Sequence, residues 1–349
     1  MAVRVLVVDD SPFYRRQLSR LLGADPDIEV VGTAPDGRRA LEAVRRLRPD
    51  LVTMDVEMPV MDGIEAVRRI MAEHPLPILM FSSLTHAGAQ ATLDALEAGA
   101  ADFLPKNLRE ITSDPEVARQ RLCRHVRALA RDSRCGAAAS PAGIRTAAAP
   151  DAPPRLVAIG ASTGGPVAVH RLLQALPADF PAAVLVIQHM PGSFTGAFAR
   201  RLDEDCALSV HEASEGDPLL PGMALVAPGG RQLGLARRAG EVTVRLRAPA
   251  PDELYAPCID QTLESCAEAL GAECHALILT GMGSDGSRGA GCLRARGGTV
   301  WVQVPEECVV AGMPRATLEA GHAQAVMGLA DMAAALCRAE GATGRRALP

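Results

Sequence analysis

The chain has 349 residues, which is long enough for two domains that each bury a hydrophobic core. Its net charge of −5, with 48% hydrophobic and 22% charged residues, is typical of a globular protein and disfavours a nucleic-acid partner. No apolar run approaches the roughly 20 residues of a membrane span, and the N-terminal sequence MAVRVLVVDD lacks a signal-peptide pattern. We therefore expect a cytoplasmic protein that neither inserts into a membrane nor binds nucleic acid.

Residues 1–130 are predicted to form an α/β domain. Apolar runs typical of buried parallel strands alternate with stretches of helical spacing. The predicted strands are Val3–Val8, Ile28–Gly32, Leu51–Met54, Ile78–Phe81 and Ala101–Leu104. The predicted helices are Arg15–Leu22, Gly37–Leu47, Ile64–Glu73, Ala89–Ala98 and Pro115–Ala130. Five βα units of this kind predict a five-stranded, doubly wound sheet.

Residues 131–154 are rich in Ala and Pro and are predicted to be a flexible linker, and a second α/β domain is predicted over 155–341. Its predicted strands are Leu156–Ile159, Ala183–Gln188, Ala224–Ala227, Ala276–Thr280 and Thr299–Gln303, with a hairpin of Gln232–Ala236 and Glu241–Leu246. Its predicted helices are Pro166–Leu176, Phe194–Asp203, Ile259–Leu270 and Met332–Glu340. We expect a doubly wound, mostly parallel sheet with Trp301 in the core, followed by a frayed tail at 342–349.

Nine cysteines are scattered through the chain without a C-x-x-C pair. This number and spacing disfavour a disulfide framework or a structural zinc site. We expect most of the cysteines to be buried reduced thiols.

Acidic side chains and the only lysine follow the predicted strands of the first domain. Asp9 and Asp10 follow the first strand, Asp55 the third, Ser82 the fourth and Lys106 the fifth. The carboxyl ends of parallel strands meet at one sheet edge, where three carboxylates require a cation such as Mg²⁺. A carboxylate beside Mg²⁺ can accept a phosphoryl group, with a lysine and a hydroxyl in support. The alternative, acids on solvated loops, explains Asp9 and Asp10 but not all five positions.

The second domain carries a serine and a histidine after consecutive major strands. Gly160-Ala161-Ser162-Thr163-Gly164 matches G-x-S-x-G, a strand–turn–helix elbow that exposes a nucleophilic serine, and no lysine follows as in a Walker loop. His189 directly follows the next strand and is a candidate general base. A helix-capping serine and a structural histidine remain the alternatives.

Asp285 lies in LTGMGSDGSRG, which also matches the dinucleotide fingerprint G-x-G-x-x-G. That interpretation would place the Asp285 carboxylate against phosphate, and it would put the fingerprint late in the domain instead of on the first βα turn. We expect instead that Asp285 accepts a hydrogen bond from His189, or that it caps the helix starting at Gly286. The order Ser…His…Asp disfavours the α/β-hydrolase fold.

Over residues 1–130 the chain resembles the receiver domain of bacterial response regulators. The matching motifs are VLVVDDS, MDVEMPVMDG, FSS and DFLPK. The resemblance implies Asp55 as the phosphorylation site, with Mg²⁺ held by Asp9, Asp10 and Asp55. It further implies Ser82 and Phe103 as a switch pair, acting with Lys106. Receivers usually have proline where this chain has Asn107.

Over residues 1–340 the chain is similar to chemotaxis protein-glutamate methylesterases of the CheB family, which also include glutamine deamidases. The motifs IGASTGG, QHMPGSF, APGG, LTGMGSDG and CVVAGMP occur in the family's order. This resemblance implies Ser162 as nucleophile, His189 as base and Asp285 as its partner, with an oxyanion hole at Thr163 and Met282. It also implies phosphorylation-activated hydrolysis of chemoreceptor methyl esters, a histidine kinase as partner and no cofactor for the esterase step.

The chain departs from the family at two places, and two other functions compete with that of an esterase. The segment Leu254–Asp260 and Gln232 differ from the residues usual in the family. A DNA-binding output is disfavoured because residues 155–349 hold 16 Arg, no Lys and 20 acids. A catalytically inactive, phosphorylation-controlled adaptor on the same fold is the alternative to an esterase.

Overall fold

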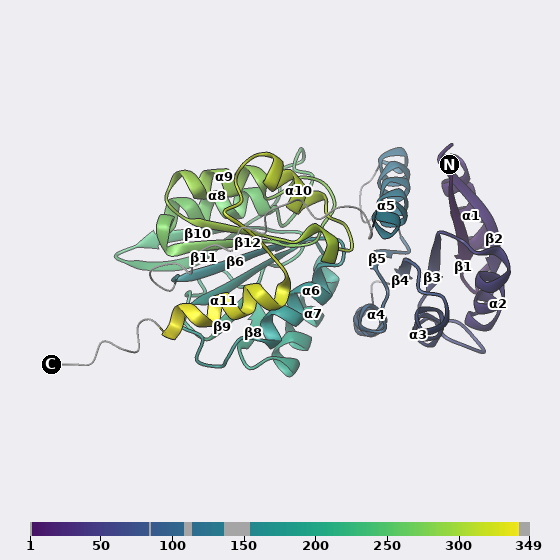
Figure 1. The fold of residues 1–349 in the computed structure, drawn as a ribbon, viewed down its shortest axis with the longest axis horizontal. Helices are drawn as coiled ribbons and strands as arrows, with labels where there is room; N and C mark the ends of the chain where they lie inside the picture. Colours follow the sequence, from purple (N-terminus) through teal and green to yellow (C-terminus); the bar gives the residue numbers. More distant parts are fainter. Residues whose placement is uncertain (1, 84, 108–113, 136–153, 342–349) are drawn as a thin grey trace. The chain divides into compact units, whose positions relative to one another are not determined.

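The computed structural model describes residues 2–83, 85–107, 114–135 and 154–341. The chain forms two compact units, Met1–Ala138 and Ala139–Pro349, and each is an α/β fold around its own parallel sheet (Figure 1). Most of the predicted linker and the whole predicted tail lie outside the described residues. The four domain bounds given above therefore stay predictions.

The first unit is the predicted five-stranded parallel sheet between two helical layers. Its elements are β1 (Val3–Val8), α1 (Pro12–Gly23), β2 (Ile28–Ala34), α2 (Gly37–Leu47), β3 (Leu51–Asp55), α3 (Gly63–Glu73), β4 (Ile78–Ser82), α4 (His86–Glu97), β5 (Asp102–Pro105) and α5 (Pro115–Cys135). The strand order is β2-β1-β3-β4-β5, and every neighbouring pair is parallel. Helices α1 and α5 lie on one face, and α2, α3 and α4 on the other (Figure 1). This order brings the ends of β1 and β3 together.

Helices α1 and α4 each begin three residues before the predicted position. Ser11 caps α1 by accepting a hydrogen bond from the Tyr14 amide, and Thr85 caps α4 by accepting one from Gly88. A side-chain cap stabilises the first turn of a helix even where that turn has no apolar residues at helical spacing. The predicted helix starts were based on that spacing, so they missed the first turn. The extra turn therefore extends each helix toward the loops that follow β1 and β4.

The second unit contains a seven-stranded parallel sheet and a separate hairpin. Its strands are β6 (Leu156–Ala161), β7 (Ala183–Gln188), β8 (Ser209–Glu212), β9 (Met223–Val226), β10 (Gln232–Arg238), β11 (Glu241–Arg247), β12 (Cys274–Ile278), β13 (Thr299–Gln303) and β14 (Ala325–Met327). Its helices are α6 (Gly165–Gln174), α7 (Gly192–Asp205), α8 (Ile259–Ala269), α9 (Ser287–Ala295), α10 (Gly312–Glu319) and α11 (Leu329–Gly341), with short 3₁₀ turns at Gly271–Glu273 and Pro305–Glu307. The order β14-β13-β12-β6-β7-β9-β8 places β6 between β12 and β7.

The predicted hairpin is confirmed, and it forms its own two-stranded antiparallel sheet. Ala239 and Gly240 make its turn with φ of 50° and 88°. Positive φ at both central residues matches the twist of two antiparallel strands, and glycine adopts it without strain. The hairpin packs against α8, so it contributes to the surroundings of the loop between β11 and α8.

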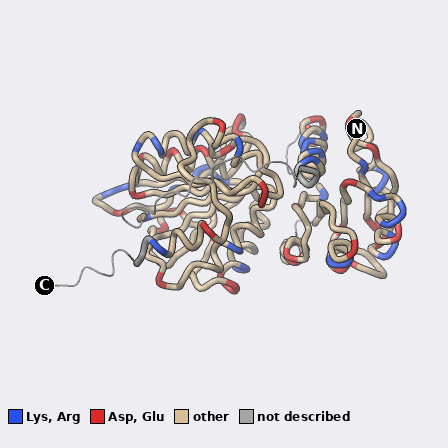
Figure 2. Tube along the Cα trace, viewed as in Figure 1, with Lys and Arg blue, Asp and Glu red and all other residues tan. Residues whose placement is uncertain are grey.

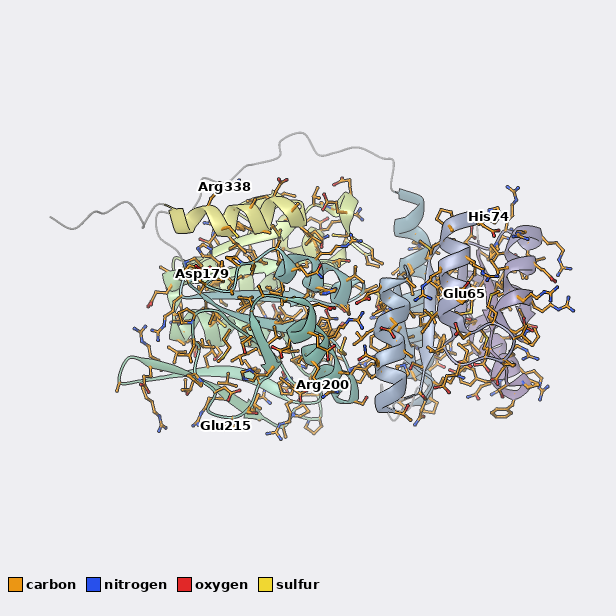
Figure 3. The ribbon with its side chains drawn as sticks, turned by 90° about the horizontal axis from the view of Figure 1, so that it is seen from below. Glu65, His74, Asp179, Arg200, Glu215 and Arg338 are labelled. Atoms are coloured by element: carbon orange, nitrogen blue, oxygen red, sulfur yellow. The ribbon has the colours of Figure 1, made fainter. Side chains whose placement is uncertain are left out.

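Side chains fill the space between sheet and helices in each unit (Figure 3). Trp301 is 1% exposed, as predicted for a core residue. The prediction for the cysteines is wrong in one respect: of the eight that the structure describes as free, only Cys123, Cys266 and Cys274 are buried. Four others, at helix ends, after a 3₁₀ turn or on α11, are half-buried, and Cys292 on α9 is exposed. None of the described helices has the length and hydropathy to cross a membrane.

A buried histidine makes the second unit sensitive to acid. Burial lowers the pKa of His275 on β12 to about 4. That pKa lies below the value of about 6.5 in the unfolded chain. The stability that the buried, neutral His275 contributes is therefore complete above pH 6.5 and is lost as the pH falls toward 4. We expect His275→Leu to reduce the loss of unfolding free energy over this range by up to about 3 kcal/mol. The fluorescence of Trp301, the only tryptophan, reports unfolding of this unit.

The exposed His74 in the first unit provides the control. His74→Gln should leave the pH dependence of the Trp301 transition unchanged. If the unfolding free energy fell equally steeply with pH in wild type and His275→Leu between pH 6.5 and 4, His275 would not be the cause of the acid sensitivity.

Candidate functional site

Three carboxylates meet at the carboxyl edge of the first unit's sheet. Carboxylate oxygens of Asp9, Asp10 and Asp55 all lie within 4.8 Å of one another. Asp9 is 1% exposed and Asp55 is 2% exposed, whereas Asp10 faces solvent. The strand order explains the cluster, because β1 and β3 are neighbours and end side by side.

Lys106 neutralises part of this cluster. Its ammonium Nζ lies 2.6 Å from Asp55 Oδ2 and 3.0 Å from Asp9 Oδ2. Burial raises the pKa of Asp55 to about 6, although Lys106 acts in the opposite direction. Burial alone would lower the pKa of Lys106, but Asp55 and Asp9 together raise it. One cation therefore faces three carboxylates, and the site is short of positive charge.

The donor set fits Mg²⁺. Carboxylate oxygens are the ligands that this ion prefers, and the exposed Asp10 leaves the ion's remaining positions open to water. Asp9 Oδ2 is buried, and within the described residues it accepts no hydrogen bond of good geometry, although Lys106 is its ion-pair partner. Asp9 Oδ1 accepts a hydrogen bond from the Ser11 amide at 2.8 Å, which fixes the carboxylate.

The predicted switch residues lie on adjacent strands of the same sheet. Ser82 ends β4, and its hydroxyl donates to the carbonyls of Ser83 and Gly88 at 3.1 Å. Phe103 lies on β5 and is 7% exposed. The Lys106 amide donates to the Ser82 carbonyl at 2.9 Å, so the end of β4 is tied directly to the lysine.

In the second unit, Ser162, His189 and Asp285 follow three neighbouring strands. Ser162 follows β6, His189 follows β7, and Asp285 lies in the loop after β12. His189 Nε2 lies 2.8 Å from Asp285 Oδ2, and both side chains are at most 10% exposed. His189 Nδ1 is also buried, and the described residues offer it no hydrogen-bond partner. That nitrogen is therefore available for a proton from a nearby group.

Asp285 is held as an anion at the start of α8. Its carboxylate accepts hydrogen bonds from the amides of Ile259 at 2.8 Å and Asp260 at 2.9 Å. Burial alone would raise the pKa of Asp285, but the hydrogen bond and charge of His189, together with these amides, lower it to about 2. Burial and the charge of Asp285 raise the pKa of Cys258 to about 12, so its thiol stays protonated and donates to Asp285 at 3.3 Å. An ionised carboxylate with fixed orientation suits a histidine partner.

A buried glutamine ties the serine turn to the histidine. Gln188 is 2% exposed, and its Nε2 donates to the Ser162 carbonyl at 2.9 Å and the His189 carbonyl at 3.1 Å. A Cβ at position 165 would lie 2.1 Å from Gln188 Oε1, so Gly165 leaves space for this amide. Sequence reasoning missed Gln188, because a polar residue at the end of an apolar strand has no distinctive pattern.

We expect Gln188→Leu to lower turnover at this site by about 100-fold, the size expected for misplacing reactive groups by about 1 Å. The substitution would also leave two carbonyls without their hydrogen-bond donor, which should lower the unfolding free energy by about 1–3 kcal/mol. Exposed Gln174 on α6 gives the matched control, Gln174→Leu. Enzyme rates together with Trp301 unfolding curves measure both effects, and a fully active Gln188→Leu variant would contradict the role assigned to the amide.

The loop after β12 passes directly beside Ser162. A Cβ at position 281 would lie 2.8 Å from Ser162 Cβ and 2.2 Å from Met313 Sδ, which only glycine avoids. The hydroxyl of Thr280 donates to the Thr163 carbonyl at 2.8 Å, joining this loop to the serine turn. In the described part of the chain, neither the Thr163 amide nor the Met282 amide donates a hydrogen bond to another protein group.

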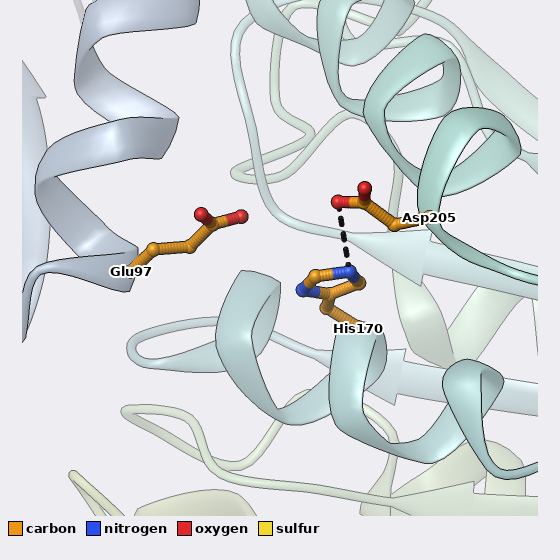
Figure 4. Close-up of side chains that lie close together, drawn as sticks. All are labelled: Glu97, His170 and Asp205. Atoms are coloured by element: carbon orange, nitrogen blue, oxygen red, sulfur yellow. Dashed lines mark ion pairs between the residues drawn. The ribbon is translucent and has the colours of Figure 1, made fainter.

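A second, partly exposed histidine–carboxylate pair lies elsewhere in this unit. His170 on α6 and Asp205 at the end of α7 form an ion pair of 3.2 Å (Figure 4). Arg201 also contacts Asp205, at 2.8 Å. This pair joins two helices and has no serine elbow, so we assign it a structural role.

Comparison with known proteins shows the family of both units. The family model described as CheB methylesterase matches residues 157–336. The chain belongs to the CheB methylesterase family. The response regulator receiver domain model matches residues 5–113, so a receiver domain precedes the CheB methylesterase domain. By class, this CheB family member is an ester hydrolase.

The CheB relatives are similar along nearly their whole length. A protein-glutamate methylesterase/protein-glutamine glutaminase of Pseudomonas aeruginosa is 50% identical, covering 95% of this chain and 98% of the relative. One from Pseudomonas putida is 48% identical at the same coverage. The crystal structure of the Thermotoga maritima CheB methylesterase catalytic domain aligns with a TM-score of 0.52 and 39% identity, covering 53% of this chain and 98% of that domain.

Proposed function

We propose that this CheB protein hydrolyses glutamate γ-methyl esters on chemoreceptors, and deamidates receptor glutamines, when Asp55 is phosphorylated. The observation that carries the proposal is the 2.8 Å contact between His189 and Asp285 at the sheet edge that also presents Ser162. The printed names of the relatives supply the substrate class. Such an enzyme would act in the cytoplasm, where a histidine kinase and the receptors' methylated segments are accessible.

The reaction proceeds by acyl transfer in two steps. Ser162 Oγ attacks the ester carbonyl while His189 Nδ1 accepts the hydroxyl proton, and Asp285 stabilises the resulting imidazolium. The amide N–H groups of Thr163 and Met282 stabilise the oxyanion. The C–O bond to the methoxy group then breaks, and methanol leaves with the proton from His189. Water repeats the sequence on the acyl-enzyme and releases the γ-carboxylate. A glutamine side chain would lose ammonia in the same way.

The receiver domain supplies the control. Asp55 accepts the phosphoryl group from the kinase, and Asp9, Asp10 and Asp55 would hold Mg²⁺, which supplies positive charge opposite the phosphoryl oxygens. Lys106 lies 2.6 Å from Asp55 and offers a second cation. Ser82 and Phe103 are proposed to change position when the phosphoryl group is present.

An active-site-directed fluorophosphonate distinguishes an esterase from an inactive adaptor on this fold. We expect the wild-type protein to form a covalent adduct at Ser162, and Ser162→Ala and His189→Gln to form none. Mass spectrometry of the labelled peptide locates the adduct. A wild-type protein that remains unlabelled while it binds a receptor fragment would support the adaptor instead. Charges of both signs are interspersed along the second unit (Figure 2), which gives no support to a nucleic-acid output.

A further inference from the structure

An aromatic ring lies flat against the histidine of the proposed triad. The rings of Tyr255 and His189 are stacked, with centroids 4.3 Å apart and planes inclined by 6°. Tyr255 belongs to the segment between β11 and α8, where the chain departs from the residues usual in the family. The following inference rests on the proposed function of His189.

The backbone at Tyr255 and directly after it is held by one buried side chain. Gln232 is 2% exposed; its Nε2 donates to the Tyr255 carbonyl at 2.7 Å, and its Oε1 accepts from the Cys258 amide at 2.9 Å. The Gly230 amide donates to the Ala256 carbonyl at 2.9 Å, adding a third anchor. The two departures, at position 232 and in the segment 254–260, are therefore one structural unit that holds Tyr255 in place.

The other end of Tyr255 reaches the proposed oxyanion loop. A Cβ at position 283 would lie 3.6 Å from the Tyr255 hydroxyl oxygen, so the phenol lies close to the Gly283 backbone. Gly283 adopts a φ of 91°, which a larger residue would resist, and it directly follows Met282. Tyr255 thus spans the distance between the histidine and the loop that would bind the oxyanion.

We infer that Tyr255 is a positioning residue of the esterase site, acting through His189. A flat ring on one face of the imidazole restricts rotation about the Cβ–Cγ bond of His189 and keeps Nδ1 directed to one place. An aromatic face also attracts a cation, so it stabilises the imidazolium formed after proton transfer more than the neutral ring. Both effects raise kcat, because they act on the transition state and not on the binding of the ester.

Two substitutions distinguish the effect of the Tyr255 ring on catalysis from the effect of its hydroxyl. Tyr255→Phe keeps the stacked ring and should retain kcat within about 3-fold. Tyr255→Leu removes the ring and should lower kcat by about 10- to 30-fold, with KM changed by less than about 3-fold. Leu220→Ala, at a side chain that is 47% exposed in the loop before β9, should leave both constants unchanged. Methanol release from a methylated receptor fragment gives kcat and KM, and the rate of fluorophosphonate labelling of Ser162 gives an independent measure.

A Tyr255→Leu variant with wild-type kcat, or one whose loss is entirely in KM, would overturn the inference. So would a Tyr255→Phe variant as impaired as Tyr255→Leu. Tyr255→Met provides a second ring-free variant if Tyr255→Leu shifts the Trp301 unfolding midpoint. If wild type is labelled at Ser162 but releases no methanol, the proposed substrate is wrong, and the labelling rates still decide the role of Tyr255.

Discussion

Ser162→Ala should release methanol from a methylated receptor fragment on the order of 10⁴- to 10⁶-fold more slowly than wild type. The reason is that Ser162 supplies the attacking hydroxyl after β6, and the hydroxyl-bearing neighbour Thr163 is buried. Adding His189→Ala should cause little further loss, because the two residues perform one step together. Initial rates with phosphorylated protein measure both effects, and binding of the receptor fragment should be unchanged.

Ser193→Ala, at an exposed serine on α7, is the matched control and should retain full activity. If the losses from Ser162→Ala and His189→Ala multiplied in the double variant, the two side chains would act independently. That result would be incompatible with a nucleophile and its base.

Asp55→Asn should reduce incorporation of a phosphoryl group from a small-molecule phosphodonor to background. An amide oxygen is a far weaker nucleophile than a carboxylate, and the neighbouring Asp9 already has one oxygen hydrogen-bonded to the Ser11 amide and the other paired with Lys106. Asp10→Asn should slow incorporation without abolishing it, because one proposed Mg²⁺ ligand is weakened. Mass spectrometry of the intact protein measures the modification.

Exposed Glu29 on β2 supplies the control for this experiment, and Glu29→Gln should be phosphorylated at the wild-type rate. Persistent phosphorylation of Asp55→Asn at an equal rate would place the acceptor at another residue. Fluorophosphonate labelling of Ser162 in the same variant would confirm that the esterase unit is folded.

The sequence predicted the long, continuously apolar strands well, because strands buried on both faces need such runs. It did not predict β8, Ser209–Glu212, a four-residue strand at the sheet edge in which only Val210 is buried. Strand β14 has three residues, too few to show a period. Helix α9 contains Gly289, where a Cβ would lie 2.6 Å from the Asp260 carbonyl. The helix packs against α8 through this glycine instead of through large apolar side chains, so it lacks the apolar spacing from which a helix is predicted.

For the candidate site, strand ends were the informative feature. They brought Ser162, His189 and Asp285 to one edge, as expected from parallel topology. The sequence left open whether Asp285 caps the helix starting at Gly286. In the structure Asp285, in the loop before α9, accepts hydrogen bonds from amides at the start of α8 and from the Gly286 amide. Asp260 of α8 accepts hydrogen bonds from the amides of Gly286 and Gly289 at the start of α9. The starts of the two helices are therefore stabilised by long-range bonds, which no local pattern shows.

The supporting residues could not be predicted for the same reason. Tyr255 and Gln232 come from the irregular segment before α8 and from the hairpin, and only the packing of those parts brings them to His189. Their one signal was a departure from the residues usual in the family, and that signal did not indicate a role. Long-range hydrogen bonds between loops depend on the whole fold and leave no period in the sequence.

The central claim is that phosphorylation at Asp55 controls hydrolysis at Ser162 in one chain. Methanol release from a labelled, methylated chemoreceptor fragment tests it most directly, with and without phosphodonor, for wild type, Ser162→Ala and Asp55→Asn. We predict that phosphodonor raises the rate of wild type, leaves Asp55→Asn at its basal rate, and has no effect on Ser162→Ala because that variant releases no methanol. A wild-type rate that stays the same while Asp55 is phosphorylated would contradict the claim.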